Sequence, residues 1–486
     1  MDYNPILQLL DSATDYQRMR LALEGGKGPV AAFGVAANAK AHLCASLART
    51  RQVLFVTATD IAAAQFHESA RLFGVRAELF LPRETPLVYV HAASGENRSA
   101  RISALCSLLL GEPCVVAASA AALMQALSPK GAFAQSQLSL SVGDTLEPRS
   151  LVERLVSAGY ERVELVEGRG QCAARGDIVD VFAPGEEYPV RIEFFGDEID
   201  QMRTFDAVSQ RSVEQISSVV IRPALETPQP KELTQKALKR IAGRAGLSDQ
   251  EDAWSEGIAS VGGDVLLPLL YKKTETLLDY LRDDAILIVD EALLIDEALR
   301  TEQLRFAETV KAMLERDEGV PEQGALERGA NETLERLHTG RTALFYALSR
   351  THPQFSPREI VNLESRGAPQ FMGAFDEIAR EIKRLNQQGE KTVIYAGEQT
   401  EELLHNLADY DAHATALGEL PKELPAGKTI ILPGQLARGF SYPQLKLNIF
   451  CEFEITGRTE RAVKKTRAKK HLSFSELSVG DYIVHE

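Results

Sequence analysis

The first 130 residues alternate short apolar runs with stretches of helical periodicity. The apolar runs have the length of strands, and a helix pattern extends from Asn38 to Leu47; the runs are Val30–Gly34, Gln52–Thr57 and Cys114–Ala118. Continuous apolar strands separated by helices are typical of a parallel sheet covered on both faces. The hydrophobic pattern therefore predicts the first part of an α/β domain in residues 1–130.

The pattern changes at about residue 131. Up to about 225, apolar and polar residues alternate with a period of two, as in Asp177–Phe182 and Val190–Phe195. This alternation predicts antiparallel sheet with one face in water. Helical patterns then return around another apolar run, Ala285–Asp290. We therefore predict that a β-rich domain at 131–225 is inserted into the α/β domain, which resumes at 226–350.

The rest of the chain predicts a smaller unit and a tail. Apolar runs at Lys391–Ala396 and Thr429–Leu432 indicate a second, smaller α/β domain at 355–456. Residues 457–470 form a basic linker, and residues 471–486 look like the first strand of a further domain. The linker carries seven basic residues against Glu460 alone, and a solvated linker is favoured over a nucleic-acid or polymerase contact.

Composition narrows the class of protein. The chain is 44% hydrophobic and 25% charged, and it contains neither an apolar run of membrane-spanning length nor a secretory signal. Its five cysteines form no CxxC pair and its histidines lack partners at ligand spacing, so we expect no metal site and a cytoplasmic location. The net charge of −15 disfavours broad adhesion to nucleic acid.

One window matches the spacing of a phosphate loop, G-x-x-x-x-G-K-[ST], between a predicted strand and a predicted helix. Gly34 and Lys40 match, but Ala39 replaces the second glycine and Ala41 replaces the hydroxyl residue. The methyl group of Ala39 crowds the approach to phosphate, and Ala41 offers no oxygen to magnesium. We therefore predict a degenerate nucleotide-binding site, no bound cofactor and no catalytic residue.

A second motif has the pattern of a Walker B element. The apolar strand that begins at Ile286 ends in Asp290 and Glu291. Alone it is better explained as a buried strand before a capped helix, but together with Lys40 it favours the remnant of an ATPase. A QxxGR motif, which a helicase motor requires in its second lobe, is absent. The fold class predicted is α/β multidomain: a degenerate P-loop domain of RecA or helicase type, a β-rich insertion, and a smaller α/β domain.

The inserted region carries the most specific signal in the sequence. It contains RGDIVDVF from Arg175, YPVRIEFFGDEID from Tyr188, RTFD from Arg203 and SQRS from Ser209. These strings closely resemble the UvrA-binding domain that the excision-repair helicase UvrB shares with the bacterial transcription-repair coupling factors. The order of segments along nearly the whole chain resembles the coupling factors, whose RNA-polymerase-interacting domain begins much like the final string LSVGDYIVHE.

The resemblance implies that UvrA contacts Arg175, Arg191, Phe195 and Arg203. Strand alternation supports this, because it sends Val190, Ile192 and Phe194 to one face and Arg191, Glu193 and Phe195 to the other. Arginine beside an aromatic residue is a common make-up of an interface hot spot. The competing interpretation is that the arginines pair with nearby acids and that Phe195 is an ordinary exposed apolar residue.

The function implied is that of a non-catalytic portion of a transcription-coupled nucleotide excision repair factor, which recruits UvrA where RNA polymerase has stalled. In the family, the full-length protein is a DNA translocase that uses ATP and Mg²⁺. It contacts RNA polymerase and double-stranded DNA through domains that would follow residue 486, so this chain is expected to be part of a longer protein.

Two alternatives remain open. A UvrB-type DNA-dependent ATPase would need an intact phosphate loop and a long aromatic hairpin, for which Leu81–Ser99 has no room. A regulator that binds RNA polymerase through its C-terminal end would need more than the first strand of that domain, because one unpaired strand makes no folded interface.

Overall fold

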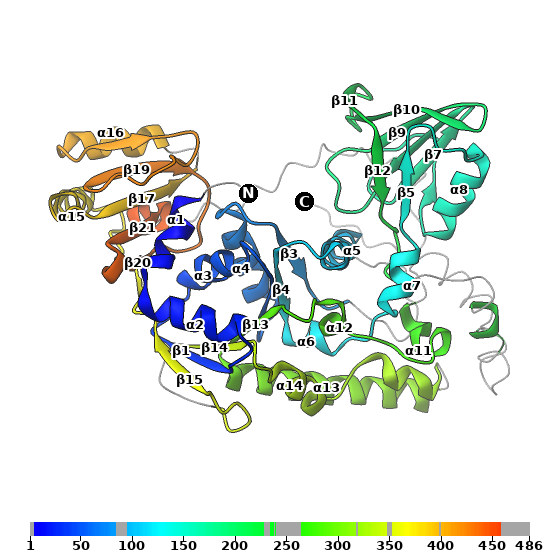
Figure 1. The fold of residues 1–486 in the computed structure, drawn as a ribbon, viewed down its shortest axis with the longest axis horizontal. Helices are drawn as coiled ribbons and strands as arrows, with labels where there is room; N and C mark the ends of the chain where they lie inside the picture. The colour runs from blue at the N-terminus through cyan, green and yellow to red at the C-terminus, as the bar shows by residue number, and fades with distance from the viewer. Residues whose placement is uncertain are drawn as a thin grey trace, which may run out of the picture.

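The computed structural model describes residues 4–83, 95–227, 234–237, 239, 264–316, 319–347, 352–397 and 400–457. Figure 1 shows a central α/β body with a β-rich lobe on one side and a smaller α/β unit on the other. The predicted linker after Gly457, the segment 471–486 and the core of the Leu81–Ser99 segment lie outside the described residues.

The central body is built on a parallel sheet of seven strands in the order β15-β1-β14-β13-β2-β4-β3. The strands that precede the β-rich lobe in sequence are β1 (Val30–Phe33), β2 (Gln52–Thr57), β3 (Ala77–Phe80) and β4 (Cys114–Ser119). Those that follow it are β13 (Ile286–Asp290), β14 (Thr342–Tyr346) and β15 (Glu359–Asn362). The predicted apolar strands are thus confirmed, and the chain leaves the sheet after β4 and returns to it at β13.

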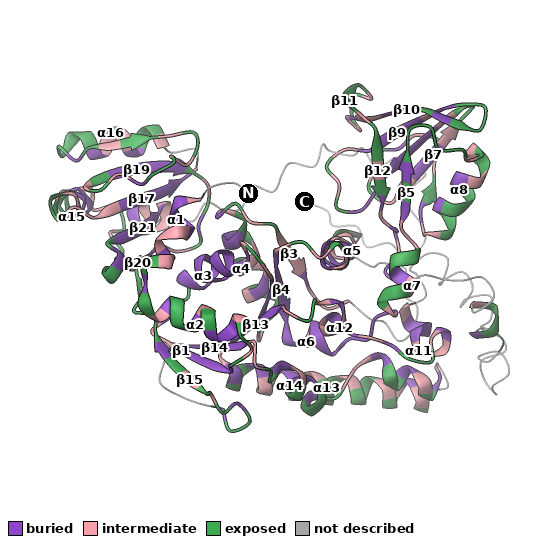
Figure 2. Ribbon diagram, in the orientation of Figure 1, coloured by how far each residue is buried: buried purple, intermediate pink, exposed green. Residues whose placement is uncertain are grey.

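Helices cover both faces of this sheet because successive strand residues point to opposite sides. Val53 and Phe55 pack under one set of helices, namely α1 (Pro5–Gln8), α2 (Thr14–Glu24), α3 (Ala39–Leu47) and α4 (Asp60–Arg71). Leu54 and Val56 pack under the second set, which is α5 (Gly95–Leu110), α6 (Ala120–Met124), α7 (Lys130–Gln135), α12 (Leu277–Tyr280), α13 (Ala292–Glu315) and α14 (Ala330–Leu337). The five inner strands are accordingly buried along nearly all of their length, whereas the edge strands β3 and β15 are partly exposed (Figure 2).

The β-rich lobe, residues 138–221, is called the inserted lobe below. Its six-stranded sheet has the order β11-β10-β9-β8-β7-β6, with β6 (Glu161–Arg162), β7 (Gln171–Arg175), β8 (Ile178–Phe182), β9 (Val190–Phe195), β10 (Glu198–Phe205) and β11 (Ser212–Ile216). All neighbours are antiparallel except β6 and β7. A separate ribbon joins the first strand of the lobe, β5 (Leu138–Ser141), to the last, β12 (Ser218–Ile221).

The smaller α/β unit contains a mixed sheet in the order β16-β20-β21-β17-β19-β18. Its strands are β16 (Arg366–Gly367), β17 (Lys391–Ala396), β18 (Ala414–Ala416), β19 (Lys428–Pro433), β20 (Phe440–Tyr442) and β21 (Leu447–Cys451), and its helices are α15 (Phe375–Gln387), α16 (Thr400–Asp409) and α17 (Glu452–Thr456). One boundary needs correction. Strand β15 lies within 355–456 but pairs with β1 in the large sheet, so the central body extends beyond residue 350.

The smaller unit shares one hydrophobic core with the central body. Phe440 and Tyr442 of β20 lie in the same buried cluster as Leu43 of α3 and Phe73. The His42 ring is packed among them, with Nε2 3.0 Å from the Ile6 carbonyl oxygen and Nδ1 3.3 Å from the Tyr442 hydroxyl. Burial lowers the pKa of His42 to about 4, so the imidazole is neutral at pH 7. A large apolar interface of this kind holds two units in one arrangement.

Candidate functional site

Strand β9 divides its side chains between the core and the solvent. Val190, Ile192 and Phe194 are buried against the helix α8 (Pro148–Ser157) side of the sheet, whereas Phe195 is 83% exposed. The alternation predicted from the sequence is confirmed. It gives the inserted lobe an inner face, which is its core, and an outer face, which includes Arg191 and Phe195.

Arg191 lies on the outer face in a fixed orientation. Its Nε and Nη2 donate to the two carboxylate oxygens of Asp180 on β8 at 2.7 and 2.8 Å, and Nη2 also donates to Gln210 at 3.2 Å. The guanidinium carbon is 4.5 Å from the ring centroid of Phe205. The hydrogen bonds that Arg191 donates to Asp180 raise the pKa of Arg191, which therefore stays charged. Nη1 makes no hydrogen bond to the described residues, so it is the nitrogen of Arg191 that can donate to a partner.

The two other predicted arginines are held less tightly. Arg203 on β10 sits across the ladder from Arg191 and pairs with Glu193. Arg175, at the end of β7, donates from Nε and Nη2 to the backbone carbonyl of Glu164 at 3.0 and 2.6 Å and is exposed. The structure thus places Arg191 and Arg203 side by side, whereas Arg175 is on β7, which β8 separates from β9.

Phe195 closes strand β9 at the turn into β10. It pairs with Glu198 across the hairpin, and the turn passes through Gly196 with φ of +66°, a conformation that glycine adopts without strain. The aromatic ring therefore stands in solvent on a short, well-defined hairpin. A large apolar side chain left exposed on a rigid element is a feature of protein-binding surfaces.

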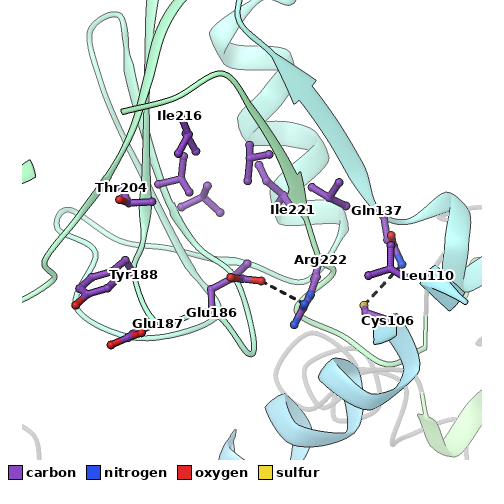
Figure 3. Close-up of a pocket in the computed structure, with 15 residues that line it drawn as sticks. Cys106, Leu110, Gln137, Glu186, Glu187, Tyr188, Thr204, Ile216, Ile221 and Arg222 are labelled. Atoms are coloured by element: carbon purple, nitrogen blue, oxygen red, sulfur yellow. Dashed lines mark hydrogen bonds and ion pairs between the residues drawn. The ribbon is translucent and has the colours of Figure 1, made fainter. Parts of the chain in front are cut away.

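A cavity of about 360 Å³ separates the inserted lobe from helix α5 (Figure 3). Its walls are mostly apolar, with Leu110 on the helix side and Val190 and Ile221 on the lobe side. Arg222 spans the junction: it pairs with Glu186 at 3.4 Å and donates to Ser103 of α5 at 3.3 Å. These contacts tie the lobe to the central body.

A buried ion-pair network lies where the chain returns from the lobe. Arg101 of α5 is fully buried and donates from Nε and Nη2 to Glu226 at 2.7 and 2.6 Å. Its guanidinium also lies 3.9 Å from the centroid of the Phe80 ring. Burial raises the pKa of Glu226, but the nearby arginines outweigh it, so this pKa is lowered and the carboxylate is charged.

The predicted degenerate nucleotide-binding residues converge at the C-terminal ends of β1 and β13. Lys40 lies in the first turn of α3 and is 8% exposed, and its Nζ is 2.5 Å from a carboxylate oxygen of Asp290. Burial raises the pKa of Asp290, and Lys40 opposes that rise. Ala39 and Ala41, in the first turn of α3, are both buried in the core. Glu291 directly precedes α13 with φ of +58°, and its carboxylate accepts from the backbone N–H of Ala347 at 2.6 Å.

The backbone of the loop Gly34–Ala41 is bonded to other parts of the chain. The Ser365 hydroxyl accepts from the Ala36 N–H at 2.7 Å and donates to the Gly34 carbonyl at 2.9 Å. Asn38 donates to the carbonyl of Gly439 in the smaller α/β unit at 3.3 Å. Gly34 has φ of +67°, and a Cβ there would stand 2.4 Å from the Asn362 side-chain oxygen. The loop thus contacts the last residue of β15 and residues that follow that strand.

Sequence reasoning missed the partners of these residues. Asp180 lies within the RGDIVDVF string, but only the register of β8 against β9 shows that it faces Arg191. Ser365 and Glu226 carry no local signal at all. Within the described residues, no three side chains of metal-binding type are gathered as a metal site, and no helix is long and apolar enough to cross a bilayer.

The chain is similar to known proteins both in one segment and over nearly its whole length. Residues 138–226 match the family model described as the UvrB interaction domain. The chain is 30% identical over 510 residues to the transcription-repair-coupling factor of Bacillus subtilis (strain 168), which covers 99% of this chain and 43% of that relative. It is 30% identical over 522 residues to that of Mycobacterium bovis, covering 99% and 42% respectively. The chain therefore spans about two fifths of the length of these relatives.

Proposed function

The chain is homologous over 99% of its length to the transcription-repair-coupling factors, and on that premise we propose that it recruits UvrA through the outer face of the inserted lobe. In this proposal the chain supplies a docking surface and performs no catalysis of its own. Displacement of stalled RNA polymerase and translocation on DNA, driven by ATP and Mg²⁺, would belong to the longer protein.

The observation that carries the proposal is the pairing of an exposed aromatic side chain with a rigidly held arginine on one strand. Phe195 and Arg191 both lie on the outer face of β9, inside the region that matches the UvrB interaction domain. Asp180 and Phe205 fix the arginine before any partner arrives, so little side-chain entropy is lost on binding. Aromatic and arginine residues dominate the energetics of many protein interfaces.

The residues of the loop Gly34–Ala41 do not fit a nucleotide with magnesium. The position of the magnesium-binding hydroxyl is taken by Ala41, whose methyl group is buried. Lys40 forms an ion pair with Asp290, and the N–H of Ala36 donates a hydrogen bond to the Ser365 hydroxyl. These contacts support the proposal that the pocket serves to hold the central body together and that the chain has no ATPase activity.

Binding of purified UvrA to the chain, measured by biolayer interferometry, tests the docking surface. Replacing Phe195 by Ala should weaken binding by about 30-fold, because a truncated hot spot costs about 2 kcal/mol. Val156→Ala is the matched control, since Val156 is half exposed on α8, which covers the opposite face of the sheet. Unaltered affinity in the Phe195 variant, or no binding by the parent chain, would contradict the proposal.

Equilibrium binding of labelled ATP in the presence of Mg²⁺ tests the second part of the proposal. We expect no saturable ATP binding with a dissociation constant below about 1 mM, which corresponds to a binding free energy of about −4 kcal/mol. We also expect no ATP hydrolysis with or without DNA. Submillimolar binding that disappears in Lys40→Ala would instead support a DNA-dependent ATPase of the UvrB type.

A further inference from the structure

The two most exposed large apolar side chains in the described residues both belong to the inserted lobe. Val208 is 95% exposed and Phe195 is 83% exposed. Single exposed valines are ordinary, so exposure alone carries no argument. What distinguishes Val208 is the structure that presents it and the residue to which that structure is bonded.

Val208 stands on a rigid turn between β10 and β11. Asp206 closes the turn: its side chain accepts from the N–H of Ser209 at 2.7 Å, and its carbonyl accepts from the N–H of Gln210 at 2.8 Å. The N–H of Asp206 in turn donates to the carbonyl of Arg211 at 2.9 Å. The turn is thus fixed by three hydrogen bonds, and the valine side chain is held in water by a backbone that cannot easily fold it away.

The same turn is bonded to Arg191 on the outer face. Gln210 has φ of +57°, and its side-chain oxygen accepts from Nη2 of Arg191. Its side-chain nitrogen donates to the carbonyls of Ala207 and Val166 at 2.8 and 3.3 Å. The backbone on either side of Val208 is therefore tied, through Gln210, to the arginine of the proposed docking surface.

Phe195 and the Val208 turn lie on opposite sides of Arg191. Phe195 is four residues from Arg191 along β9, or about 13 Å at 3.3 Å per residue. The turn lies toward the other end of β9, where the N–H of Phe205 donates to the carbonyl of Pro189 at 3.0 Å. A stable interface buries about 800 Å² on each partner, which one aromatic residue and one arginine cannot supply.

We propose that Val208 is a second apolar anchor of the docking surface, which extends from Phe195 across Arg191 to the turn Asp206–Arg211. This rests on the proposed function, because the occupant is the same partner protein, UvrA. The surface that fits would offer one apolar pocket for Phe195, another for Val208, and a hydrogen-bond acceptor for Arg191 Nη1 between them.

The test is a set of binding measurements between UvrA and full-length variants of the chain. Val208→Ser should weaken binding about tenfold, as expected when one apolar side chain is withdrawn from a buried contact. Val208→Asp should weaken it further, because a carboxylate would be buried without a partner. Val156→Ser on α8 removes an equal apolar group from the opposite face and should leave the affinity unchanged. All variants should melt at the parent temperature, since both valines are exposed.

The outcomes separate the two proposals. Weaker binding by both Val208 variants with a silent Val156→Ser control supports the extended surface. Parent affinity in both Val208 variants, alongside a weakened Phe195→Ala, overturns this inference and leaves the proposed function standing. Failure of the parent chain to bind UvrA overturns both.

Discussion

Replacing Arg191 by Met should destabilise the inserted lobe as well as weaken partner binding. Methionine keeps an apolar stem near the Phe205 ring but removes both hydrogen bonds to Asp180. The Asp180 side chain is 5% exposed, so its carboxylate would be left almost without solvent and without a partner. Arg191 therefore stabilises the lobe through Asp180, and under the proposed function it also binds the partner, so a variant of this residue alone cannot distinguish the two roles.

The magnitude follows from the burial of the pair. Breaking a buried ion pair by removing one partner costs about 3–5 kcal/mol, and the lower end applies because the arginine is still 18% exposed. We therefore expect the free energy of unfolding of the lobe to fall by about 3 kcal/mol. Changing Asp180 to Leu in the same molecule removes the stranded charge, and most of the stability should return.

Hydrogen exchange of the β8 and β9 amides is the suitable assay, because one global transition does not describe a chain of several units. The single variant should lose protection in both strands, and the double variant Arg191→Met/Asp180→Leu should regain it while still binding UvrA weakly. Parent-level protection in Arg191→Met, or a double variant as unprotected as the single, would refute the reasoning. The central sheet provides an internal control, since its exchange should not change.

Three further predictions concern ionisable side chains that are shielded from solvent. Lys40→Met strands the Asp290 carboxylate and should lower the melting temperature measured by calorimetry, whereas ATP should not shift it in either protein. Burial raises the pKa of Glu327 to about 8. The contribution of Glu327 to stability is therefore complete below its ordinary pKa and is lost as pH rises through 8. The urea midpoint of Glu327→Gln, relative to that of the parent chain, should accordingly increase between pH 5 and pH 9. Arg101→Met leaves the buried Glu226 carboxylate with only the longer ion pair to Arg83, at 3.7 Å, and should cost about 3 kcal/mol, seen as increased protease cleavage at the base of the inserted lobe.

Local patterns in the sequence were sufficient to predict individual strands and the faces that they bury. Period-two alternation predicted which side chains of β9 face the core, and continuous apolar runs predicted the strands of the parallel sheet. The spacing of the phosphate-loop template was enough to bring Lys40 near Asp290, although 250 residues separate them. Each of these features depends on residues adjacent in sequence or on a motif with a fixed fold.

The pairing of strands that lie far apart in the sequence could not be predicted from it. Strand β15 falls within the range predicted for the smaller α/β unit, because nothing in its own residues identifies its partner, yet it pairs with β1 at the edge of the central sheet. The contact between Arg191 and Asp180 depends on strand register, which changes every cross-strand neighbour when it slips by one residue. The exposure of Val208 depends on how a turn is bonded, and alternation gives no information about turns.

The ribbon formed by β5 and β12 makes the inserted lobe portable. Leu138 and Ile221 are direct partners in that ribbon, so the lobe begins and ends at points about 5 Å apart. A segment whose ends meet can be carried by any host loop of similar span without disturbing the host core. Residues 138–221 could thus be grafted as a cassette onto an unrelated scaffold. Under the proposed function, that scaffold would then acquire the ability to bind UvrA.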